Sequence, residues 1–316
     1  MKNRVEVEKN KDRLCIDVAK LYYQSEFSQQ QIAQQMGISR PSVSRLLQYA
    51  KEQGYVNIQI IDPVENMEDL ERQLARKYGM QEVRIAYSTL NDPGEIKKYI
   101  GSKAAEYLNE IVRDGDIIGV SWGTTMYNVA CRLKSRALKG AQIVQLKGGV
   151  TDGKSTTYAD EILEKFAKAF STIARYLPLP VIFGTKEVKE MVDQDRHIKR
   201  ILELGRQANI AIFTVGTVKE DALLFRLGYI EAVDKAKLQQ IAVGDICSRF
   251  FDREGQICNA EIDDRTVGIK LAELRDKERS ILVAGGERKV EAIRAALVGQ
   301  YANVLITDQY TAKALL

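Results

Sequence analysis

The spacing of apolar residues divides this chain into a helical N-terminal part and a longer part in which strands alternate with helices. A helix is predicted over residues 13–24, because one face there carries the apolar side chains Leu14, Val18, Leu21 and Tyr22. From residue 83 onward, short apolar runs are separated by longer segments of helical periodicity. The pattern therefore predicts two regions of different architecture.

Residues 29–48, QQQIAQQMGISRPSVSRLLQ, predict a helix, a tight turn and a second helix. Gly37 occupies the turn, where a positive φ costs other residues about 1–2 kcal/mol more than it costs glycine. Ser28 and Ser39 are suited to cap the two helices, and Pro41 falls in the first turn of the second helix. These signals are typical of a helix-turn-helix.

The side chains of this segment separate into an apolar and a polar face. Ala33 is small where the helices would cross, and the space between them would be filled by Ile32, Ile38, Val43, Leu46 and Leu47. The residues expected to contact DNA include no acidic side chain and are Gln29, Ser39, Arg40, Pro41, Ser42, Ser44, Arg45 and Gln48. An ordinary helical hairpin also has a polar face, but the agreement of caps, turn and apolar positions favours DNA binding.

Two predicted elements follow this segment. In GYVNIQI (54–60), apolar and polar residues alternate, which predicts a short strand, the wing of a winged helix. Residues 65–78 predict a helix that would either pair with its copy in a dimer or pack on its own second domain. We therefore expect a helix-turn-helix domain over 1–62, a linker helix over 63–80, and an effector-binding and oligomerisation domain over 81–316.

The second region predicts a doubly wound α/β domain. Its strand candidates are VRIAY, DIIGVSW, AQIVQLKGG, IAIFTVG, ILVAGG and NVLIT, and helical patterns such as EIKKYIGSKAAEYLNEIV and RKVEAIRAALVG lie between them. Continuous apolar strands separated by helices indicate a parallel sheet that is covered on both faces. In such folds, ligands bind beyond the carboxyl ends of the strands.

Composition narrows the class of protein. A length of 316 residues suits two domains, and a hydrophobic content of 45% can fill a sizeable core. The net charge is +4, of which +3 falls within residues 1–60, a weak footprint that is compatible with DNA binding. No apolar run could span a bilayer and the charged N-terminus lacks a secretion segment, so we expect a cytoplasmic protein with no membrane partner.

Neither a metal site nor a histidine-based mechanism is indicated. Cys15, Cys131, Cys247 and Cys258 show no CxxC spacing and have no histidine nearby, so we expect reduced thiols and no metal or cofactor. The single histidine, His197, lies in the charged stretch DQDRHIKR, which is typical of a surface position. A Ser-His-Asp mechanism would have to use it.

The segment SWGTTMY supplies the first ligand-site candidate. Gly123 would let the backbone approach a ligand, and Thr124 and Thr125 offer hydroxyl and N–H groups at the start of a helix, where the dipole favours an anion. A capped strand-to-helix turn without a ligand would show the same pattern. The GxxxxGK[ST] spacing is absent, which argues against nucleotide hydrolysis.

The segment AGGERK repeats this arrangement near the C-terminus. Gly285 and Gly286 end a predicted strand, and Lys289 lies in the first turn of the next helix. A lysine at this position opposes the helix dipole, which is more favourable when an anion lies nearby.

Lys147 is the most informative candidate. It ends the apolar strand AQIVQL and is followed by Gly148 and Gly149. Apolar surroundings lower the pKa of a lysine, and a neutral amine can form a Schiff base with an aldehyde. Two other interpretations stay open, an ammonium paired with a phosphate or with a carboxylate such as Asp116, and a lysine that extends to solvent.

The segment GDICSRFFD adds a fourth group of candidates. Asp245 could accept hydrogen bonds from sugar hydroxyls, and Arg249 could pair with a carboxylate or an anion. The two phenylalanines that follow are more typical of a core or a lid than of chemistry.

These motifs together resemble the SorC-type sugar-responsive transcriptional regulators over nearly the full chain. The segments that carry the resemblance are QQIAQQMGISRPSVSRLL, DIIGVSWGTTMY, IVQLKGG, VGDICSRFFD, RSILVAGGERK and YANVLITDQYTA. The family implies an N-terminal helix-turn-helix domain and an effector domain similar to sugar-phosphate isomerases. Its phosphate-binding loop maps onto Gly123, Thr124 and Thr125, and its later glycines and lysine map onto Gly148, Gly149, Gly285, Gly286 and Lys289.

Lys147 departs from the family pattern, which has a polar amide at this position. The departure points to an effector with an aldehyde group, and the open form of deoxyribose 5-phosphate has one. The resemblance thus implies a repressor of a deoxyribonucleoside or deoxyribose operon that self-associates to a dimer or tetramer. It would release its operator on binding the phosphorylated sugar, with a Schiff base at Lys147. The alternative is an enzyme, a sugar-phosphate isomerase or Schiff-base aldolase with an appended DNA-binding domain.

Overall fold

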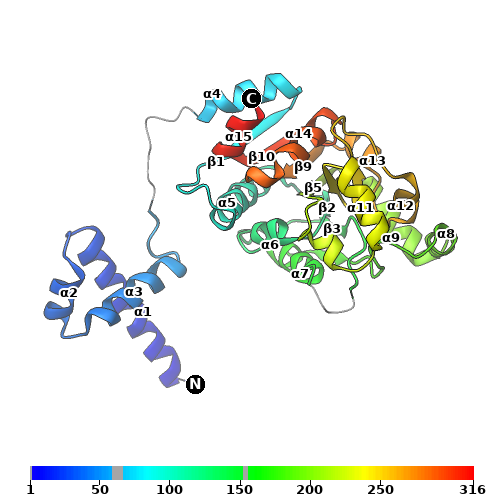
Figure 1. Ribbon diagram of the computed structural model, residues 1–316. Helices are drawn as coiled ribbons and strands as arrows, with labels where there is room; N and C mark the ends of the chain where they lie inside the picture. Colours follow the sequence, from blue (N-terminus) through cyan, green and yellow to red (C-terminus); the bar gives the residue numbers. More distant parts are fainter. Residues whose placement is uncertain (1, 59–66, 152–155) are drawn as a thin grey trace. The chain divides into compact units, whose positions relative to one another are not determined.

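The computed structural model of the protein describes residues 2–58, 67–151 and 156–316 (Figure 1). The chain divides into two compact units, residues 1–65 and residues 66–316. Within the described residues, none of the helices combines the length and the apolar character needed to cross a membrane.

Three helices form the N-terminal unit, and they are α1 (Lys2–Tyr23), α2 (Gln29–Met36) and α3 (Arg40–Glu52). Helix α3 packs against both of the others. Their shared core consists of the buried residues Cys15, Val18, Ala19, Ile32, Val43, Leu47 and Ala50. Ile38 and Leu46 are half-buried against this core, so the predicted packing of the helix-turn-helix is confirmed.

Local hydrogen bonds explain where these helices begin and end. The Ser28 hydroxyl accepts from the Gln31 backbone N–H at 3.3 Å, and the Gln31 side chain accepts from the Ser28 N–H at 2.9 Å, which is a capping box. Helix α2 ends at Gly37, whose φ is +65°. The Ser39 hydroxyl accepts from the Ser42 N–H at 3.3 Å and starts α3.

The predicted wing strand is wrong for the part that the structure describes. Residues 54–58 form a turn followed by irregular backbone, and residues 59 and 60 lie outside the described residues. The side chains of Tyr55 and Ile58 are exposed. An alternating pattern becomes a strand only when it finds a partner strand, and the described part of this unit contains none.

Helix α4 (Met67–Tyr78) belongs to the second unit, where it contacts β1 (Glu82–Ala86) and α15 (Gln309–Leu315) (Figure 1). Its Leu74 is fully buried. The Glu71 carboxylate accepts from the Ile85 N–H at 2.7 Å, and burial raises the pKa of this carboxyl. Of the two interpretations left open for this helix, packing on its own domain therefore accounts for the face that carries Leu74.

Seven parallel strands form the main sheet. In spatial order they are β1, β10 (Val304–Asp308), β9 (Arg279–Val283), β5 (Ile210–Phe213), β2 (Ile117–Val120), β3 (Gln142–Gln145) and β4 (Ile173–Arg175). In the register of the sheet, Val120 lies opposite Gln145 on one side and Ile212 on the other. The parallel sheet is thus confirmed, while β4, with two exposed residues out of three, lacks the apolar run that revealed the other strands.

Successive residues of the central strands face two different cores. Ile281 and Val283 join one core, and Leu282 joins the other. The first core is covered by α5 (Pro93–Ile111), α6 (Thr124–Ala130) and α7 (Ala159–Ala169), and the second by α4 and α14 (Val290–Val298) (Figure 1). Because both faces of the sheet are covered, the strands are apolar throughout rather than alternating.

A small antiparallel sheet contains β6 (Val215–Gly216), β7 (Gly244–Ile246) and β8 (Arg249–Phe251). Strand β6 follows β5 after one residue, so the predicted run IAIFTVG covers two strands. The other elements of this unit are α8 (Lys186–Asp193), α9 (Arg196–Gln207), α10 (Leu223–Arg226), α11 (Ala232–Ile241), α12 (Ala260–Arg265), α13 (Leu271–Arg275) and the 3₁₀ turn η1 (Glu287–Lys289).

The direction of strand addition reverses between β2 and β5. Strands β3 and β4 lie on one side of β2, whereas β5 and the later strands lie on the other. The loops that leave two such strands diverge and open a crevice at the carboxyl edge of the sheet. Gly123 and Thr214 meet there, because a Cβ built on Gly123 would lie 4.0 Å from the Thr214 methyl carbon. The fold thus brings Gly123 and Thr214 to the edge at which sheets of this topology bind ligands.

Candidate functional site

Helix α3 presents the predicted DNA-contact face to solvent. Arg40, Ser44 and Arg45 are exposed. The Arg45 Nε donates to the Pro41 carbonyl oxygen at 3.4 Å, and the Gln48 amide donates to Glu52 at 3.0 Å. Because these contacts are local to the helix, the guanidinium groups remain accessible for phosphates and base edges.

The other predicted DNA contacts lie close to this face. Ser39 and Ser42, at the start of α3, join their hydroxyls at 2.8 Å, so Ser39 also serves as the helix cap. Pro41 is exposed in the first turn, and Gln29 is half-buried at the start of α2. The eight predicted residues therefore lie on α3, at its N-cap and at the start of α2.

Lys147 lies buried just past β3, at the carboxyl edge of the main sheet. Its Nζ donates to the Ser248 hydroxyl at 3.3 Å and lies 3.5 Å from the centre of the Trp122 ring. Trp122 follows β2, and its indole N–H donates to the Gly148 carbonyl at 2.7 Å. Three chain segments that are far apart in sequence thus surround one lysine amine.

Asp245 on β7 is the acidic member of this cluster. It is buried, and its Oδ2 accepts from the Ser248 backbone N–H at 3.0 Å. Burial raises the pKa of Asp245 and lowers the pKa of Lys147, while the attraction between the two charges partly opposes both shifts. Burial therefore disfavours the charged form of both groups, and a lysine must lose its charge to react as a nucleophile.

Lys289 forms a second cationic centre. Burial lowers its pKa to about 8, the nearby charge of Lys97 adds to this effect, and the charge of Asp245 opposes it. Its Nζ donates to the Thr214 hydroxyl at 3.3 Å. Lys97, on α5, and Lys289, in η1, repel each other, and an anion beside them would stabilise both charges.

The β2–α6 loop lies next to Thr214. Gly123 has φ +127° and ψ 170°, a conformation that a side chain would strain. The next residue, Thr124, is exposed and begins α6, whereas Thr125 is buried. Within the described residues, the buried hydroxyls of Ser121 and Thr307 have no hydrogen-bond partner, and Ser121 lies directly between β2 and this loop.

Gly148 packs against protein backbone. A Cβ on Gly148 would lie 2.1 Å from the Pro180 carbonyl oxygen. Gly149 donates its N–H to the Leu179 carbonyl at 3.0 Å, although it also lines a cavity of about 920 Å³ at the start of α7. The contact with Pro180 explains why a glycine is required at position 148 even if no ligand binds there. Gly148 is therefore left out of the proposed effector site.

Gly285 and Gly286 also have partners within the protein. The Gly286 N–H donates to Asp308 at 3.1 Å and to the Thr311 hydroxyl at 2.7 Å. A Cβ on Gly285 would lie 2.3 Å from the Asp308 carboxylate. The pair joins the loop to β10, and Lys289 is the member of this motif whose side chain can meet an anion.

Arg249 is fully occupied by protein groups. Its donors reach the carbonyl oxygens of Ile269, Thr266 and Gly268, and both the carbonyl and the carboxylate of Asp263, at 2.7 to 3.2 Å. Five N–H groups make these five contacts, which is all that a guanidinium has. Arg249 therefore braces the segment 263–269 and has no donor left for an effector.

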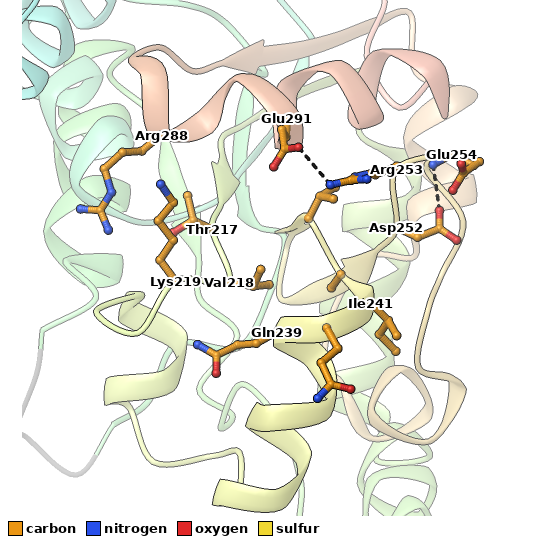
Figure 2. Close-up of a pocket in the computed structure, with 13 residues that line it drawn as sticks. Thr217, Val218, Lys219, Gln239, Ile241, Asp252, Arg253, Glu254, Arg288 and Glu291 are labelled. Carbon is orange, nitrogen blue, oxygen red and sulfur yellow. Dashed lines mark hydrogen bonds and ion pairs between the residues drawn. The ribbon is translucent and has the colours of Figure 1, made fainter.

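A smaller cavity of about 370 Å³ lies between β6, α11, the turn after β8 and α14 (Figure 2). Among its charged residues, Arg253 donates to Glu291 at 3.4 Å, and Arg288 pairs with Asp221. None of the predicted effector residues lines it. The candidate site is therefore the cluster formed by the buried Lys147 and Asp245 and the half-buried Lys289, rather than this cavity.

Sequence reasoning missed four side chains of the cluster: Ser121, Trp122, Thr214 and Ser248. Trp122 lies inside the motif SWGTTMY, so its position beside the glycine loop was available as a signal. No signal in the sequence marked Ser248 or Thr214, because Ser248 matters through its contact with Lys147 and Thr214 through its contact with Lys289, both across long sequence separations. Among the described residues, no group of three or more histidine, cysteine or acidic side chains is arranged to hold a metal ion.

Comparison with known proteins agrees with this architecture. Residues 62–316 match the Sugar-bind model of sugar-binding domains, and residues 21–59 match the MarR family model. The crystal structure of the full-length sorbitol operon regulator SorC from Klebsiella pneumoniae is 29% identical, with a TM-score of 0.75, and the match covers 96% of this chain and 97% of that one.

Two curated regulators match along nearly the whole chain. The deoxyribonucleoside regulator of Bacillus subtilis is 56% identical over 309 residues, covering 98% of this chain and 99% of that protein. The sorbitol operon regulator of Klebsiella pneumoniae is 32% identical, covering 96% and 98%. With its helix-turn-helix unit and its sugar-binding domain, the chain belongs to the SorC family of sugar-binding transcriptional regulators.

Proposed function

We propose that this protein represses genes for the use of deoxyribonucleosides and releases its operator when deoxyribose 5-phosphate binds the sugar-binding domain. The name of the Bacillus subtilis relative supports the class of genes. The observation that carries the choice of effector is the buried Lys147 at the carboxyl edge of the sheet, whose pKa is lowered by burial and whose amine donates to Ser248 within the electrostatic influence of Asp245. A lowered pKa makes the lysine amine easier to deprotonate, and a deprotonated amine can react with an aldehyde to form an imine.

The exposed face of α3 reads the operator. Arg40 and Arg45 carry the positive charge of that face, and Ser42, Ser44 and Gln48 add neutral hydrogen-bonding groups. Gln29 and Ser39 bond to phosphates at the ends of the two helices, and Pro41 sets the first turn of α3. Self-association to a dimer or tetramer would present two such faces to a symmetric site.

The phosphate of the effector binds near Lys289. Lys289 and Lys97 repel each other, and Asp245 only partly offsets this repulsion. A phosphate dianion next to them lowers the energy of both cations. Gly123, Thr124 and Thr125 lie at the adjoining loop and supply further donors, and the unpartnered hydroxyl of Ser121 is available beside them.

The aldehyde of the open-chain sugar reacts with Lys147. The Nζ lone pair attacks C1, and the carbonyl electrons move to oxygen, which takes a proton and becomes a hydroxyl. A protonated Asp245 then donates a proton to that hydroxyl, which leaves as water as the C=N bond forms, and the carboxylate recovers a proton from the nitrogen. One amine and one aldehyde thus give one imine and one water, with no oxidant or reductant.

Regulation requires that the effector bind the operator-bound and released states unequally. The test is a gel shift in which the protein binds promoter DNA of its own operon while the concentration of deoxyribose 5-phosphate is increased. We expect the DNA complex to dissociate with the phosphorylated sugar and to persist with free deoxyribose. If no pentose or hexose phosphate dissociates the protein–DNA complex, the proposal is contradicted.

An enzymatic function is the second candidate, because a buried lysine with a lowered pKa and a buried aspartate with a raised pKa also fit a Schiff-base aldolase or a sugar-phosphate isomerase. The two functions differ in whether the bound sugar changes. Incubation of the protein with deoxyribose 5-phosphate separates them by product analysis. Saturable binding without turnover supports the sensor, whereas catalytic turnover supports the enzyme.

A further inference from the structure

The turn that joins β7 to β8 has an unusual backbone. Its two residues, Cys247 and Ser248, have φ values of +51° and +68°. Strands β7 and β8 pair so that Ile246 lies opposite Arg249, which makes this a two-residue hairpin of type I′. Such turns ordinarily contain Asn-Gly or Asp-Gly, because other side chains strain in the left-handed region.

This strained turn delivers one buried hydroxyl to the Lys147 amine. Ser248 has no exposed surface. Its hydroxyl accepts from Lys147 Nζ at 3.3 Å, and its backbone N–H donates to Asp245 at 3.0 Å. One residue therefore contacts both Lys147 and Asp245, and backbone strain at a functional site is commonly retained for such a purpose.

The geometry also determines where the amine lone pair points. A neutral amine has two N–H bonds and one lone pair. One N–H is directed to the Ser248 hydroxyl, and the face of the Trp122 ring, 3.5 Å away, attracts the other. With both N–H bonds engaged in this way, the lone pair points away from Ser248 and Trp122 and stays free to react.

We propose that Ser248 is a positioning residue for imine formation, in that its hydroxyl, held by the strained β7–β8 turn, aims the lone pair of Lys147 at C1 of an aldehyde-bearing phosphorylated sugar. This inference rests on the proposed function. In the step itself the N–C1 bond forms and the carbonyl oxygen leaves as water with the two amine protons, relayed by Asp245. Ser248 keeps its own proton throughout.

The experiment measures imine formation in the full-length protein. Deoxyribose 5-phosphate is added, the imine is trapped with borohydride after increasing times, and the mass of the Lys147 peptide reports the fraction modified. The trapping rate is followed from pH 7 to pH 10.5, with the sugar at a saturating concentration at each pH. At the upper plateau the amine is neutral in every variant, so a difference in plateau rate reports orientation rather than protonation.

Two substitutions of Ser248 separate the hydroxyl from the backbone. Ser248→Ala removes the hydroxyl and keeps the strained turn, whereas Ser248→Gly removes the hydroxyl and relaxes it. We expect both to lower the plateau rate about tenfold. Cys247→Gly relaxes the neighbouring turn position, keeps the hydroxyl, and should trap at the rate of the unmodified sequence. Binding of the reduced sugar, 2-deoxyribitol 5-phosphate, should remain within about twofold in all three variants.

Each outcome decides one point. No adduct with the unmodified sequence overturns the imine and the role of Ser248 together. An adduct that forms equally fast in Ser248→Ala overturns the role of Ser248 and leaves the imine standing. If trapping is slow in Ser248→Ala but normal in Ser248→Gly, the residue matters only for the folding of the turn, and its positioning role is overturned. The same conclusion follows if the variants lose binding of the reduced sugar.

Discussion

The Asp308 carboxylate, at the end of β10, accepts a hydrogen bond from the backbone N–H of Gly286 at 3.1 Å. The same carboxylate caps α15 by accepting from the N–H groups of Tyr310 and Thr311. At the far end of α15, the Leu315 carbonyl accepts from the Tyr78 hydroxyl of α4 at 2.8 Å. A continuous set of contacts thus runs from the loop before Lys289 to the first described helix after the helix-turn-helix unit.

Replacing Asp308 with asparagine should weaken this connection. One carboxylate oxygen faces the Gly286 N–H and the Thr311 hydroxyl, and an amide NH₂ there would oppose these two donors instead of accepting from them. We expect a loss of about 1–3 kcal/mol in unfolding free energy and weaker release of DNA by the effector. Denaturant titration and gel shifts measure the two effects.

The matched control for Asp308 is Asp92→Asn, because Asp92 caps α5 in the same way but is exposed. The control should lose less stability and keep its response to the sugar. If Asp308→Asn responds to the sugar as the unmodified protein does, the contacts along α15 do not carry the signal.

Lys289 should make both stability and effector affinity depend on pH. Burial lowers its pKa to about 8, below its ordinary value of 10.5. Between these values the unfolded chain binds more protons than the folded one, so the unfolding free energy rises as pH rises from about 8 to 10.5. Below pH 8 both states are protonated, and the cost of burying the charge is present in full. Lys289→Met should reduce this rise, to which the lowered pKa values of Lys147 and Lys277 also contribute. Lys98→Met, at an exposed position, should leave it unchanged.

A phosphate bound near Lys289 stabilises the ammonium form, so effector binding above pH 8 should take up a proton. Affinity should then fall by roughly tenfold for each pH unit above 8, until the pKa of the complex is reached. Calorimetry at pH 9 in two buffers of different ionisation enthalpy measures the proton directly. Binding without proton uptake would place the phosphate elsewhere.

The sequence predicts the parts of this molecule whose signals are local. The helix-turn-helix follows from caps at Ser28 and Ser39 and a turn at Gly37, all within twelve residues. The central strands follow from continuous apolar runs. Strand β4 escapes prediction because Ile173 and Arg175 are exposed and only three residues pair.

The candidate site is less predictable because it depends on contacts between distant segments. Lys147 could be identified from its place after an apolar strand, but its hydroxyl partner Ser248 lies 101 residues away. Glycines are ambiguous for a different reason, since a glycine that approaches a ligand and one that packs on backbone look alike in sequence. Gly148 belongs to the second kind, as its distance to the Pro180 carbonyl shows.

Gly216 provides a way to disturb Asp245 without changing its chemistry. The two residues lie opposite each other on β6 and β7, and a Cβ on Gly216 would lie 1.9 Å from the Asp245 Oδ1. Gly216→Ala should therefore displace the carboxyl group, lower the yield of trapped adduct at Lys147 about tenfold, and cost about 1–3 kcal/mol in stability. Gly184→Ala, which would meet no atom within 4 Å, is the control. Unchanged trapping in Gly216→Ala would remove Asp245 from the proposed proton transfers.

Arg40 tests the other half of the proposal. It is exposed at the start of α3, where a recognition helix meets base edges. If Arg40 makes a bidentate contact with a base, Arg40→Ala should cost about 1–3 kcal/mol in operator affinity and relax specificity at one position. Fluorescence anisotropy with promoter DNA and with unrelated DNA measures both quantities.

The control for Arg40 is Arg13→Ala, since Arg13 is equally exposed but lies on α1. Salt titration adds a second readout. A phosphate contact would lower affinity for every sequence alike and reduce the salt slope by about one, whereas a base contact would mainly narrow the gap between promoter and unrelated DNA. If Arg40→Ala binds promoter DNA as tightly as Arg13→Ala does, Arg40 takes no part in reading the operator, and the face of α3 centred on Arg45 becomes the one to test.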